Sequence, residues 1–465
     1  MSTKNNIDLP TFFRPLTTNP FKTSIMSEHS IIKILQLSVP FVNMLTLQEL
    51  QCTCKYMDNF IVSYLWKKPL FHNHSINDSL TMFRKFLDQL PHLRQSTCQV
   101  IRELDFTCIE ESLYERVPKD FFHKLVKYTP KLMTLNLSHT NFMNIHSLPK
   151  KELNWQLKFL TSLDASYMEH MTDQLLLDLA IHLPQLHLIR LDSTKVNMGV
   201  GQLTHHCDLL SSLSLKQTQI NDEALIALAK FRTIHISELD ISHCSNITST
   251  GLNMLAKYCI HLSWLGLAYT NISMATLQRF DNRFWKYLDI SQCQQLHKDL
   301  INNNQNPSIL DNFSTEIKKA SKTIYDSITA APNLEYLLVS TPTIDYLLNM
   351  YKQYQMNSLI PESYTSPSIV NRLVIYGLRE HTPLNFIEDL KLLFPVVKHI
   401  KIMRNYFESD FFYGSYSTTD KPPITTTITE NNLKKYYIRN IKNEPIVIEV
   451  QNQNEIVEST NMTYW

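Results

Sequence analysis

The chain has 465 residues, of which 43% are hydrophobic and 19% charged, and its formal net charge is +1. This length and composition allow a large buried core, and the near-zero charge gives no overall attraction to nucleic acid or to an anionic membrane. The opening MSTKNNIDLP lacks the apolar core of a signal peptide, and no run of about eighteen apolar residues occurs. We therefore expect a soluble, unsecreted protein, cytoplasmic, nuclear or both, with no membrane or nucleic-acid partner.

Residues 27–71 are predicted to form a small helical module behind a flexible N-terminus at residues 1–26. The run IIKILQLSV after Ser30 has an apolar stripe that stops before Pro40, and Thr46-Leu47-Gln48-Glu49 has the pattern of a capping box that starts a second helix. Apolar residues recur at steps of three and four along one face of this second helix, at Leu47, Leu50, Cys54, Met57, Ile61 and Leu65. A helical connector over residues 72–97 follows.

From about residue 98 to residue 410, the phrase Leu-x-x-Leu-x-Leu or a close variant returns along the chain. Regular copies start at Leu132, Leu160, Leu186, Leu210, Ile236 and Leu262, and looser copies start at Ile101, Trp285, Leu334, Val370 and Val397. The regular copies are 24 to 28 residues apart. This period is the signature of leucine-rich repeats, in which each unit supplies one strand and one helix to a curved solenoid that holds another protein.

The segment ISELDIS alternates apolar and polar residues, as a strand with one buried face must. The expected inward residues are Leu239 and Ile241, and the expected outward residues are Glu238, Asp240 and Ser242. Cys244 then lies beneath the turn, and Thr248 is expected to cap the return helix. At the Cys244 position, other units carry Thr140, Thr194, Thr218, Thr270 and Cys293.

Two segments depart from the repeat. The step from Trp285 to Leu334 is 49 residues, and the polar, Asn-rich stretch at about residues 302–330 predicts an inserted surface loop with a helix toward Lys319. Within residues 411–465, FFYGSYSTTDKPPITTTITE resembles a linker in composition. YYIRNIKNEPIVIEV then predicts either a hairpin around Lys442–Pro445 that caps the last solenoid edge or a disordered tail.

The run THHCDLLSSLSLKQTQINDEALIALAKF from Thr204 is similar to the cysteine-containing subclass of leucine-rich repeats, with Thr in place of Cys in the turn. The resemblance implies a ribonuclease-inhibitor-like horseshoe. Its fold class would be α/β, a right-handed solenoid with an inner parallel sheet and outer helices, preceded here by the small all-α module.

The segment LTLQELQCTCKYMDNFIVSYLWKKP resembles the second half of an F-box, with Cys54-Lys55 and Leu65-Trp66-Lys67 at the family's separation. The Leu-Pro that usually opens an F-box is missing before Ile31, and Met57 stands where the family has Trp. An F-box, a helical connector and cysteine-type repeats, in this order, are the arrangement of the F-box leucine-rich-repeat family.

This resemblance implies a substrate-recognition subunit of a Skp-cullin-F-box type ubiquitin ligase. The F-box would dock on the Skp-type adaptor and through it on a cullin-RING ligase, and the repeats would hold an unknown protein substrate. Such a subunit is not an enzyme and needs no cofactor. The alternative is a leucine-rich-repeat scaffold or a regulator, for example of cell-cycle exit, that binds a protein without recruiting a ligase.

An apolar face on the helical module is larger than three short helices can hide, so we expect a helical partner groove to cover it. The expected adaptor-binding residues are Leu47, Leu50, Cys54, Ile61, Leu65 and Trp66. Some of them have a second interpretation as core of the module, and Leu65 or Trp66 could instead form the joint with the connector.

On the repeats, outward residues of successive strands form ladders along the concave face. The expected substrate-binding residues are Asp164, Arg190, Lys216, Asp240, Trp264, Tyr287, Asp289, Tyr336, Arg372 and Tyr376. Clustered aromatics with arginine are favoured at protein interfaces, so the stretch from Trp264 to Tyr376 is the preferred surface. The Asp residues have a second interpretation, as repeat consensus that serves neighbouring strand ends and does not contact the substrate.

No catalytic or metal-binding motif was found in the sequence. The close pair Gly199 and Gly201 lacks the third glycine of a dinucleotide loop, and HExxH, GxSxG and paired CxxC are absent. Cys52 and Cys54 are two residues apart on a helix, so their side chains point about 200° apart and cannot meet at one ion. His205-His206-Cys207 is interpreted as the end of a repeat helix. The scattered cysteines do not suggest a disulfide framework.

Overall fold

The computed structural model describes residues 44–53, 55–71, 79–111, 116–148, 157–230, 235–305, 324–329, 331–356, 368–377, 385–404, 427–430, 433–439 and 445–452. The chain divides into two compact units, Met1–Leu65 and Trp66–Trp465. The predicted helix after Ser30, Cys54 and the expected helix toward Lys319 lie outside the described residues.

The described part of the first unit consists of helix α2 (Met44–Gln51) and most of helix α3 (Lys55–Lys67). Because α2 already includes Met44, Thr46 lies inside the helix and the predicted capping box is wrong. The predicted single stripe is also wrong, since a turn after Gln51 divides it between the two helices. The side-chain amide of Gln51 donates to Asp58 Oδ1 across this turn at 2.9 Å.

The two helices share a small core. Leu47 and Ile61 are 4% and 1% exposed, and the partly buried residues packed against them are Leu50, Met57, Phe60 and Leu65. Burial of this kind stabilises each helix mainly through its apolar face, because helices this short are marginal alone.

The second unit begins with the connector. It contains α4 (Ser79–Gln89), a short 3-10 helix, η3 (Leu90–His92), and α5 (Gln95–Cys98). Phe83 and Phe86 of α4 are buried, and the Trp66 ring stacks on Phe86 with centroids 6.3 Å apart. Trp66 therefore packs on the connector, which is one of the two roles expected for it.

A sheet runs through the second unit, and its strands β1 to β11 pair in parallel with their neighbours in chain order. The strands are β1 (Glu103–Asp105), β2 (Thr134–Asn136), β3 (Ser162–Asp164), β4 (Leu188–Arg190), β5 (Ser212–Ser214), β6 (Glu238–Asp240), β7 (Trp264–Gly266), β8 (Tyr287–Asp289), β9 (Tyr336–Ser340), β10 (Arg372–Tyr376) and β11 (His399–Arg404). Each predicted copy of the leucine phrase supplies one of them, so this prediction is confirmed.

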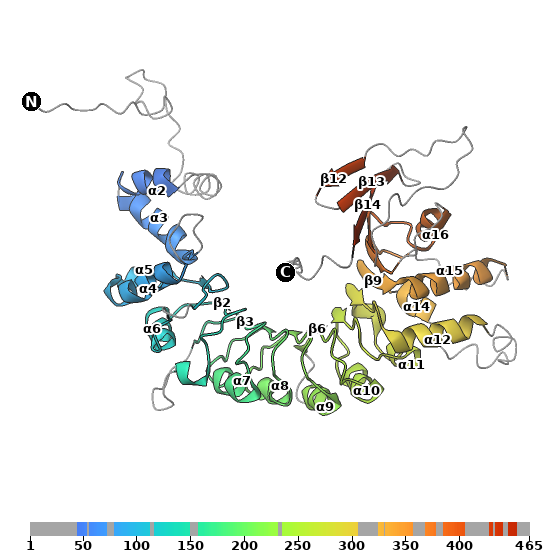
Figure 1. The fold of residues 1–465 in the computed structure, drawn as a ribbon, viewed down its shortest axis with the longest axis horizontal. Coiled ribbons are helices and arrows are strands. Elements are labelled where there is room, and N and C mark those ends of the chain that lie inside the picture. Colours follow the sequence, from blue (N-terminus) through green and yellow to red (C-terminus); the bar gives the residue numbers. More distant parts are fainter. Residues whose placement is uncertain are drawn as a thin grey trace, which may run out of the picture. The chain divides into compact units, whose positions relative to one another are not determined.

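Helices follow most strands and lie together on one face of the sheet, which leaves the opposite face to the strands (Figure 1). They are α6 (Phe121–Tyr128), α7 (Asp173–Ala180), α8 (Gly199–His206), α9 (Asp222–Lys230), α10 (Ser249–Tyr258), α11 (Met274–Leu277), α12 (Gln294–Gln305), α14 (Ile324–Thr329), α15 (Thr341–Met356) and α16 (Asn385–Leu393), with 3-10 turns η4 (Ile145–Ser147) and η6 (Asn282–Phe284). The second unit is thus an α/β leucine-rich-repeat solenoid. His205 and His206 end α8, as expected.

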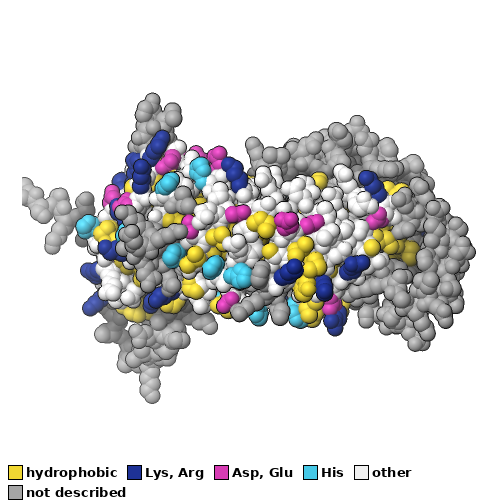
Figure 2. Space-filling view, turned by 90° about the horizontal axis from the view of Figure 1, so that it is seen from below, with side chains coloured by type: hydrophobic (Ala, Val, Ile, Leu, Met, Phe, Trp, Pro, Cys, Tyr) yellow, Lys and Arg dark blue, Asp and Glu magenta, His cyan; other side chains and the backbone are white. Residues whose placement is uncertain are grey.

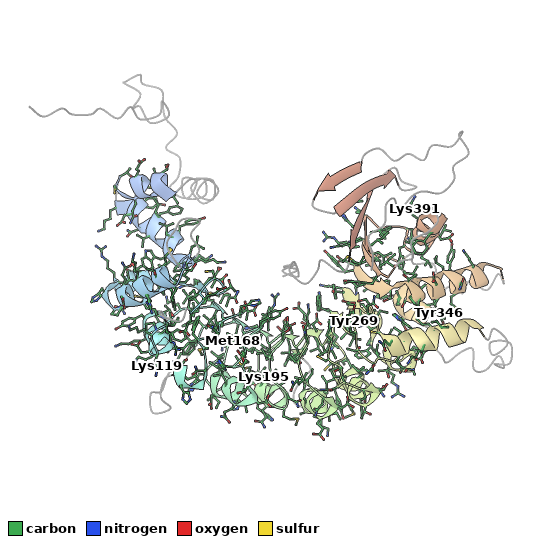
Figure 3. The ribbon with its side chains drawn as sticks, in the orientation of Figure 1. Lys119, Met168, Lys195, Tyr269, Tyr346 and Lys391 are labelled. Atoms are coloured by element: carbon green, nitrogen blue, oxygen red, sulfur yellow. The ribbon has the colours of Figure 1, made fainter. Side chains whose placement is uncertain are left out.

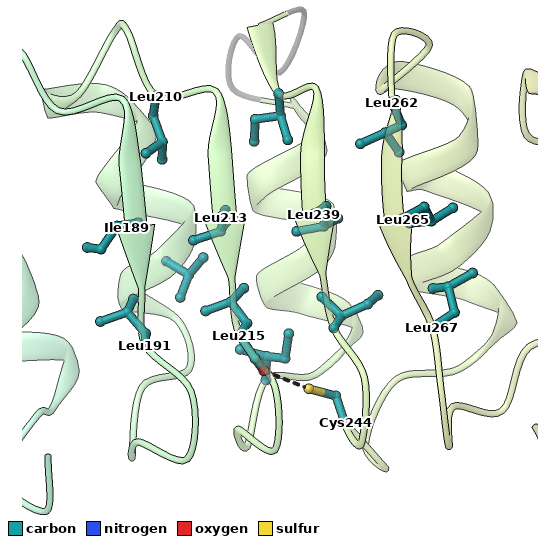
Figure 4. Packing of buried hydrophobic residues seen from close by; sticks show 14 of the residues in the cluster. Ile189, Leu191, Leu210, Leu213, Leu215, Leu239, Cys244, Leu262, Leu265 and Leu267 are labelled. Carbon is teal, nitrogen blue, oxygen red and sulfur yellow. Dashed lines mark hydrogen bonds between the residues drawn. The ribbon is translucent and has the colours of Figure 1, made fainter. Parts of the chain in front are cut away.

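The core lies between the strands and the helices. Leu213, Leu239 and Leu265 occupy the same strand position in successive repeats and form a row of contacts in this layer (Figure 4). Side chains such as the buried Met168 fill the rest of the layer (Figure 3). Burying one leucine side chain contributes about 2 kcal/mol, so the repeated leucine is the main stabilising element of the solenoid.

The Thr and Cys of the turn hydrogen-bond to the strand they follow or to the one before. Thr218 Oγ1 and Cys244 Sγ both donate to the carbonyl oxygen of Leu215, at 2.8 and 3.1 Å. Thr270 and Cys293 do the same at Leu267, at 2.6 and 3.1 Å. The structure therefore places Cys244 beneath the turn as predicted, and Thr248 accepts from the amide of Thr250 as the expected N-cap.

Two glycines let neighbouring helices approach α8. A Cβ on Gly201 would lie 2.5 Å from the Cβ of Ala227 in α9, and one on Gly199 would lie 2.8 Å from Asp173 Oδ1 in α7. Glycine costs about 1 kcal/mol inside a helix, so close packing between repeats explains why the pair is placed there.

The sheet continues beyond the repeats. Strand β14 (Pro445–Asn452) pairs in parallel with β11, β13 (Leu433–Arg439) pairs antiparallel with β14, and β12 (Thr427–Glu430) pairs with β13. The expected hairpin is present, and it covers the last repeat strand. The interpretation of the preceding stretch as linker is wrong for Thr427–Glu430, because these four residues form β12. At the insertion, α12 continues to Gln305.

Candidate functional site

Four of the expected substrate-binding residues form one continuous row. Trp264, Tyr287, Tyr336 and Arg372 are the first residues of β7 to β10 and stand in register. The Trp264 and Tyr287 rings stack with centroids 3.9 Å apart and planes at 8°, and Tyr287 lies 6.4 Å from Tyr336. The Arg372 guanidinium lies 5.0 Å from the centre of the Tyr336 ring. Sheet register therefore assembles an aromatic row from residues up to 108 positions apart in the sequence.

Lys216 extends this row at the Trp264 end. Its ammonium lies 6.0 Å from the Trp264 ring centre and 3.0 Å from Asp240 Oδ2. Burial lowers the pKa of Lys216, but Asp240 and Asp192 outweigh it, so the pKa lies above its ordinary value. Lys216 therefore remains charged at physiological pH.

As predicted, Asp240 does not point into the core between the strands and the helices, but it is only 3% exposed, and Ser242 is 4% exposed. Asp240 Oδ1 accepts from the Ser242 amide at 3.0 Å. The adjacent strand position is Gly266, where a Cβ would lie 2.5 Å from the Asp240 carboxylate. Asp240 thus occupies the space that a side chain at position 266 would fill, and its direct contact with a substrate stays a prediction.

Asp164 and Asp289 make the same hydrogen bond as Asp240, since the Oδ1 atom of each accepts from the backbone amide two residues later at 3.0 Å. Each satisfies the end of its own strand. The second interpretation named neighbouring strand ends, which differs from this arrangement, and contact of these Asp residues with a substrate stays a prediction.

Asp289 at the end of β8 and Asp192 just after β4 are ionisable groups in a desolvated setting. Burial raises the pKa of each to about 6 from 3.8, although Ser291 and Ser214 donate to them. The Ser291 hydroxyl lies 2.7 Å from Asp289 Oδ1 and the Ser214 hydroxyl 2.6 Å from Asp192 Oδ1. Their ionised forms therefore oppose folding.

The pH dependence of stability follows from this shift. Between pH 3.8 and about 6 the folded protein holds the Asp289 proton more tightly than the unfolded chain does, so this group makes stability fall as the pH rises through that window. Asp289→Asn should raise the urea midpoint at pH 7.5, and the gain should shrink toward pH 4. A variant less stable than wild type at pH 7.5, or an equal gain at both pH values, would contradict the raised pKa.

The structure does not bring every expected residue into this row. Asp164 and Arg190 pair with each other at 3.7 Å, on β3 and β4. Tyr376 lies at the other end of β10 from Arg372. The central residues of β9 and β10 are Leu338 and Val374, which are in register and partly exposed.

Sequence reasoning missed a second ladder, at the turns that follow strands β2 to β8. Its members are His139, Tyr167, Ser193, Gln217, His243, Tyr269 and Gln292, with φ between 54° and 62°. The side chains pair between repeats: His139 stacks on Tyr167 at 4.4 Å, and His243 on Tyr269 at 4.2 Å. The tripeptide Ser-His-Thr and its variants, repeated before each helix, was the available signal, but left-handed backbone is not expected without glycine.

The expected adaptor residues have unequal exposure. Leu47 and Ile61 are buried in their own unit, whereas Leu50, Leu65 and Trp66 are partly buried. Exposed aromatics on α3 that the sequence analysis did not select are Tyr56 and Tyr64, 37% and 41% exposed.

Three wider observations concern charge, metals and membranes. On the face seen in Figure 2, acidic, basic and hydrophobic side chains are interspersed over the described part. Among the described residues, no group of three His, Cys, Asp or Glu side chains is placed to hold a metal ion. Within the same residues, no helix has the length and apolar character needed to cross a bilayer.

Comparisons with known proteins add little. No family model and no curated protein matches the chain. Among solved structures, an internalin (inlF) from Listeria monocytogenes is 15% identical with a TM-score of 0.33, over 60% of this chain and 62% of the internalin chain.

Two further structures have similarly low scores. The yeast Rad7 and Elc1 complex gives 14% identity and a TM-score of 0.34, over 82% of this chain and 94% of that one. The TLR13-ssRNA13 complex gives 14% identity and a TM-score of 0.33, over 69% of this chain and 44% of that one. This chain therefore spans less than two thirds of the internalin and TLR13 chains. At such TM-scores these likenesses carry no argument, and the repeat fold rests on this chain's own strands and register.

Proposed function

We propose that this protein is the substrate-recognition subunit of a Skp-cullin-F-box type ubiquitin ligase. The main support is the order of its parts: a compact helical unit with its own small core precedes a leucine-rich-repeat sheet whose face carries an aromatic row. The segment from Leu45 to Pro69 resembles an F-box in sequence. The helical unit would bind the adaptor, and the sheet would bind the substrate.

In this role the chain performs no chemistry. It raises the local concentration of substrate lysines near a charged E2 enzyme held elsewhere in the assembly. The long, continuous sheet suits this task because it holds interface residues on rigid strands rather than on loops.

One observation favours the second candidate, a repeat scaffold that recruits no ligase. Leu47 and Ile61, two of the six expected adaptor contacts, are buried in their own unit. Fewer apolar side chains are thus offered to an adaptor than the sequence suggested.

Co-purification from cells tests the proposal. The tagged full chain is expected to recover the Skp-type adaptor and a cullin, and Leu50→Asp combined with Leu65→Asp should lower adaptor recovery at least tenfold, because both side chains are partly exposed next to the buried pair. Changes at Leu47 or Ile61 are less informative, since a buried carboxylate would disrupt the unit itself.

Ile260→Asp is the matched control, since Ile260 is an exposed apolar residue of the repeats. It should leave recovery of the adaptor unchanged. If the wild-type chain recovers no adaptor, the receptor proposal fails and the scaffold remains.

A further inference from the structure

The inner sheet face from β4 to β8 has a local excess of negative charge. We define the acid-aromatic patch as Asp192, Lys216, Asp240, Trp264, Tyr287 and Asp289. It holds three carboxylates and one ammonium, whereas the whole chain carries a net charge of +1. Lys216 is already paired with Asp240 at 3.0 Å. The remaining excess therefore lies on Asp192 and Asp289.

Both of these carboxylates retain acceptor capacity. Asp289 accepts the Ser291 amide and hydroxyl through Oδ1 alone, and Asp192 accepts the Ser214 hydroxyl and the Lys216 amide through Oδ1 alone. Within the described part of the chain, no hydrogen bond reaches the second oxygen of either group. Desolvated carboxylates in this condition gain most from a cation that supplies both charge and donors.

The surroundings select the kind of cation. Trp264 and Tyr287, whose rings stack, are the first residues of β7 and β8, and Gly266 and Asp289 are the last. The aliphatic part of a lysine or arginine side chain can therefore cover the ring edges while its charged group reaches Asp289. Continuing along the sheet, Leu338 and Val374 are in register with Asp289 and partly exposed. A polyanion fits none of this, because it would meet carboxylates at close range.

We propose that the inner face of β4 to β10 binds an extended segment of a partner protein that presents lysine or arginine side chains to Asp192 and Asp289 and an apolar side chain to Leu338 and Val374. This proposal deepens the proposed function. It rests on the proposed function only in assuming that the sheet face binds a protein. The recognition would combine charge complementarity with an aromatic anchor.

Selection from a phage library of random peptides, about twelve residues long so as to span several strands 4.8 Å apart, tests the proposal on the purified full chain. Peptides that combine Lys or Arg with a nearby apolar residue should be enriched on the wild type. On Asp192→Asn combined with Asp289→Asn, that enrichment should disappear, and the affinity of selected peptides should fall at least tenfold. Circular dichroism checks that each variant is folded.

Glu169→Gln combined with Glu223→Gln is the matched control, since both are exposed and removing them changes the net charge equally. It should behave as wild type. The proposal would be overturned by enrichment of acidic peptides or by no enrichment of basic ones. Equal enrichment on the Asn variant, or retention of an RNA pool by the patch, would also overturn it. The adaptor is absent from this assay, so its outcome is independent of the co-purification result.

Discussion

Trp264→Ala is expected to weaken binding of the selected basic peptides by about thirtyfold or more, which corresponds to roughly 2 kcal/mol. Trp264 is the first ring of the row, stacked on Tyr287 at 3.9 Å and lying 6.0 Å from the Lys216 ammonium. Its loss removes an aromatic anchor and also leaves Lys216 and Tyr287 without their shared neighbour. Fluorescence polarisation with labelled peptides measures the change.

Tyr258→Ala is the comparison for this prediction. Tyr258 is an exposed aromatic at the end of α10, on the helical side of the second unit. Its loss should leave peptide affinity within a factor of two. Equal affinities for wild type and Trp264→Ala would show that the aromatic row is not the binding surface.

Trp285→Ala is expected to lower the free energy of unfolding by about 3–5 kcal/mol. Trp285 is fully buried and is among the largest fully buried side chains of the described residues. It occupies the first apolar position of the β8 repeat, where Leu262 and Leu334 stand in the flanking repeats. Alanine there would leave a cavity between two packed repeats. Urea denaturation measures the loss.

Trp285→Leu isolates the effect of the cavity, because leucine and alanine both remove the indole N–H but leave different volumes unfilled. The Trp285 Nε1 is buried and has no hydrogen-bond partner among the described residues. An unsatisfied buried donor costs about 1–3 kcal/mol, and leucine removes it while filling part of the volume. Trp285→Leu should therefore cost less than half as much as alanine. Equal losses would mean that the volume retained by leucine does not stabilise the core.

The repeats could be predicted from the sequence because their information is local and redundant. Alternation around Leu239 defines a strand, and the same phrase some 26 residues away must pair with it in register, since each unit can bury its apolar face only against the next. The turn residues were equally legible, because Thr218 and Cys244 bond to the same carbonyl group.

The helical module was harder to predict. The spacing from Leu47 to Leu65 fits one helix, and nothing in it signals that the chain turns after Gln51. Apolar periodicity reports which residues share a face, and two helices that bury the same face give nearly the same pattern. The capping-box motif at Thr46 failed for a related reason, since a local motif is overridden when the helix continues before it.

The candidate site was predicted in part. Counting outward positions correctly placed Trp264, Tyr287, Tyr336 and Arg372 in one row, because sheet register fixes which residues adjoin. It could not show that Asp240 would lie over Gly266 and pair with Lys216, nor that Asp192 would join them from beyond the end of β4. Those placements depend on the absence of a side chain at Gly266 and on the desolvation of the carboxylates, neither of which the repeat pattern of the sequence predicts.

The central claim is that this chain carries a working adaptor-binding unit joined to a partner-binding sheet. Light scattering of the purified full chain mixed with a purified Skp-type adaptor, at roughly 10 μM each, tests it most directly, because a stable interface of standard size should be nearly saturated there. We predict a single species with the summed mass of one copy of each protein. Two separate species with the masses of the free proteins would contradict the claim.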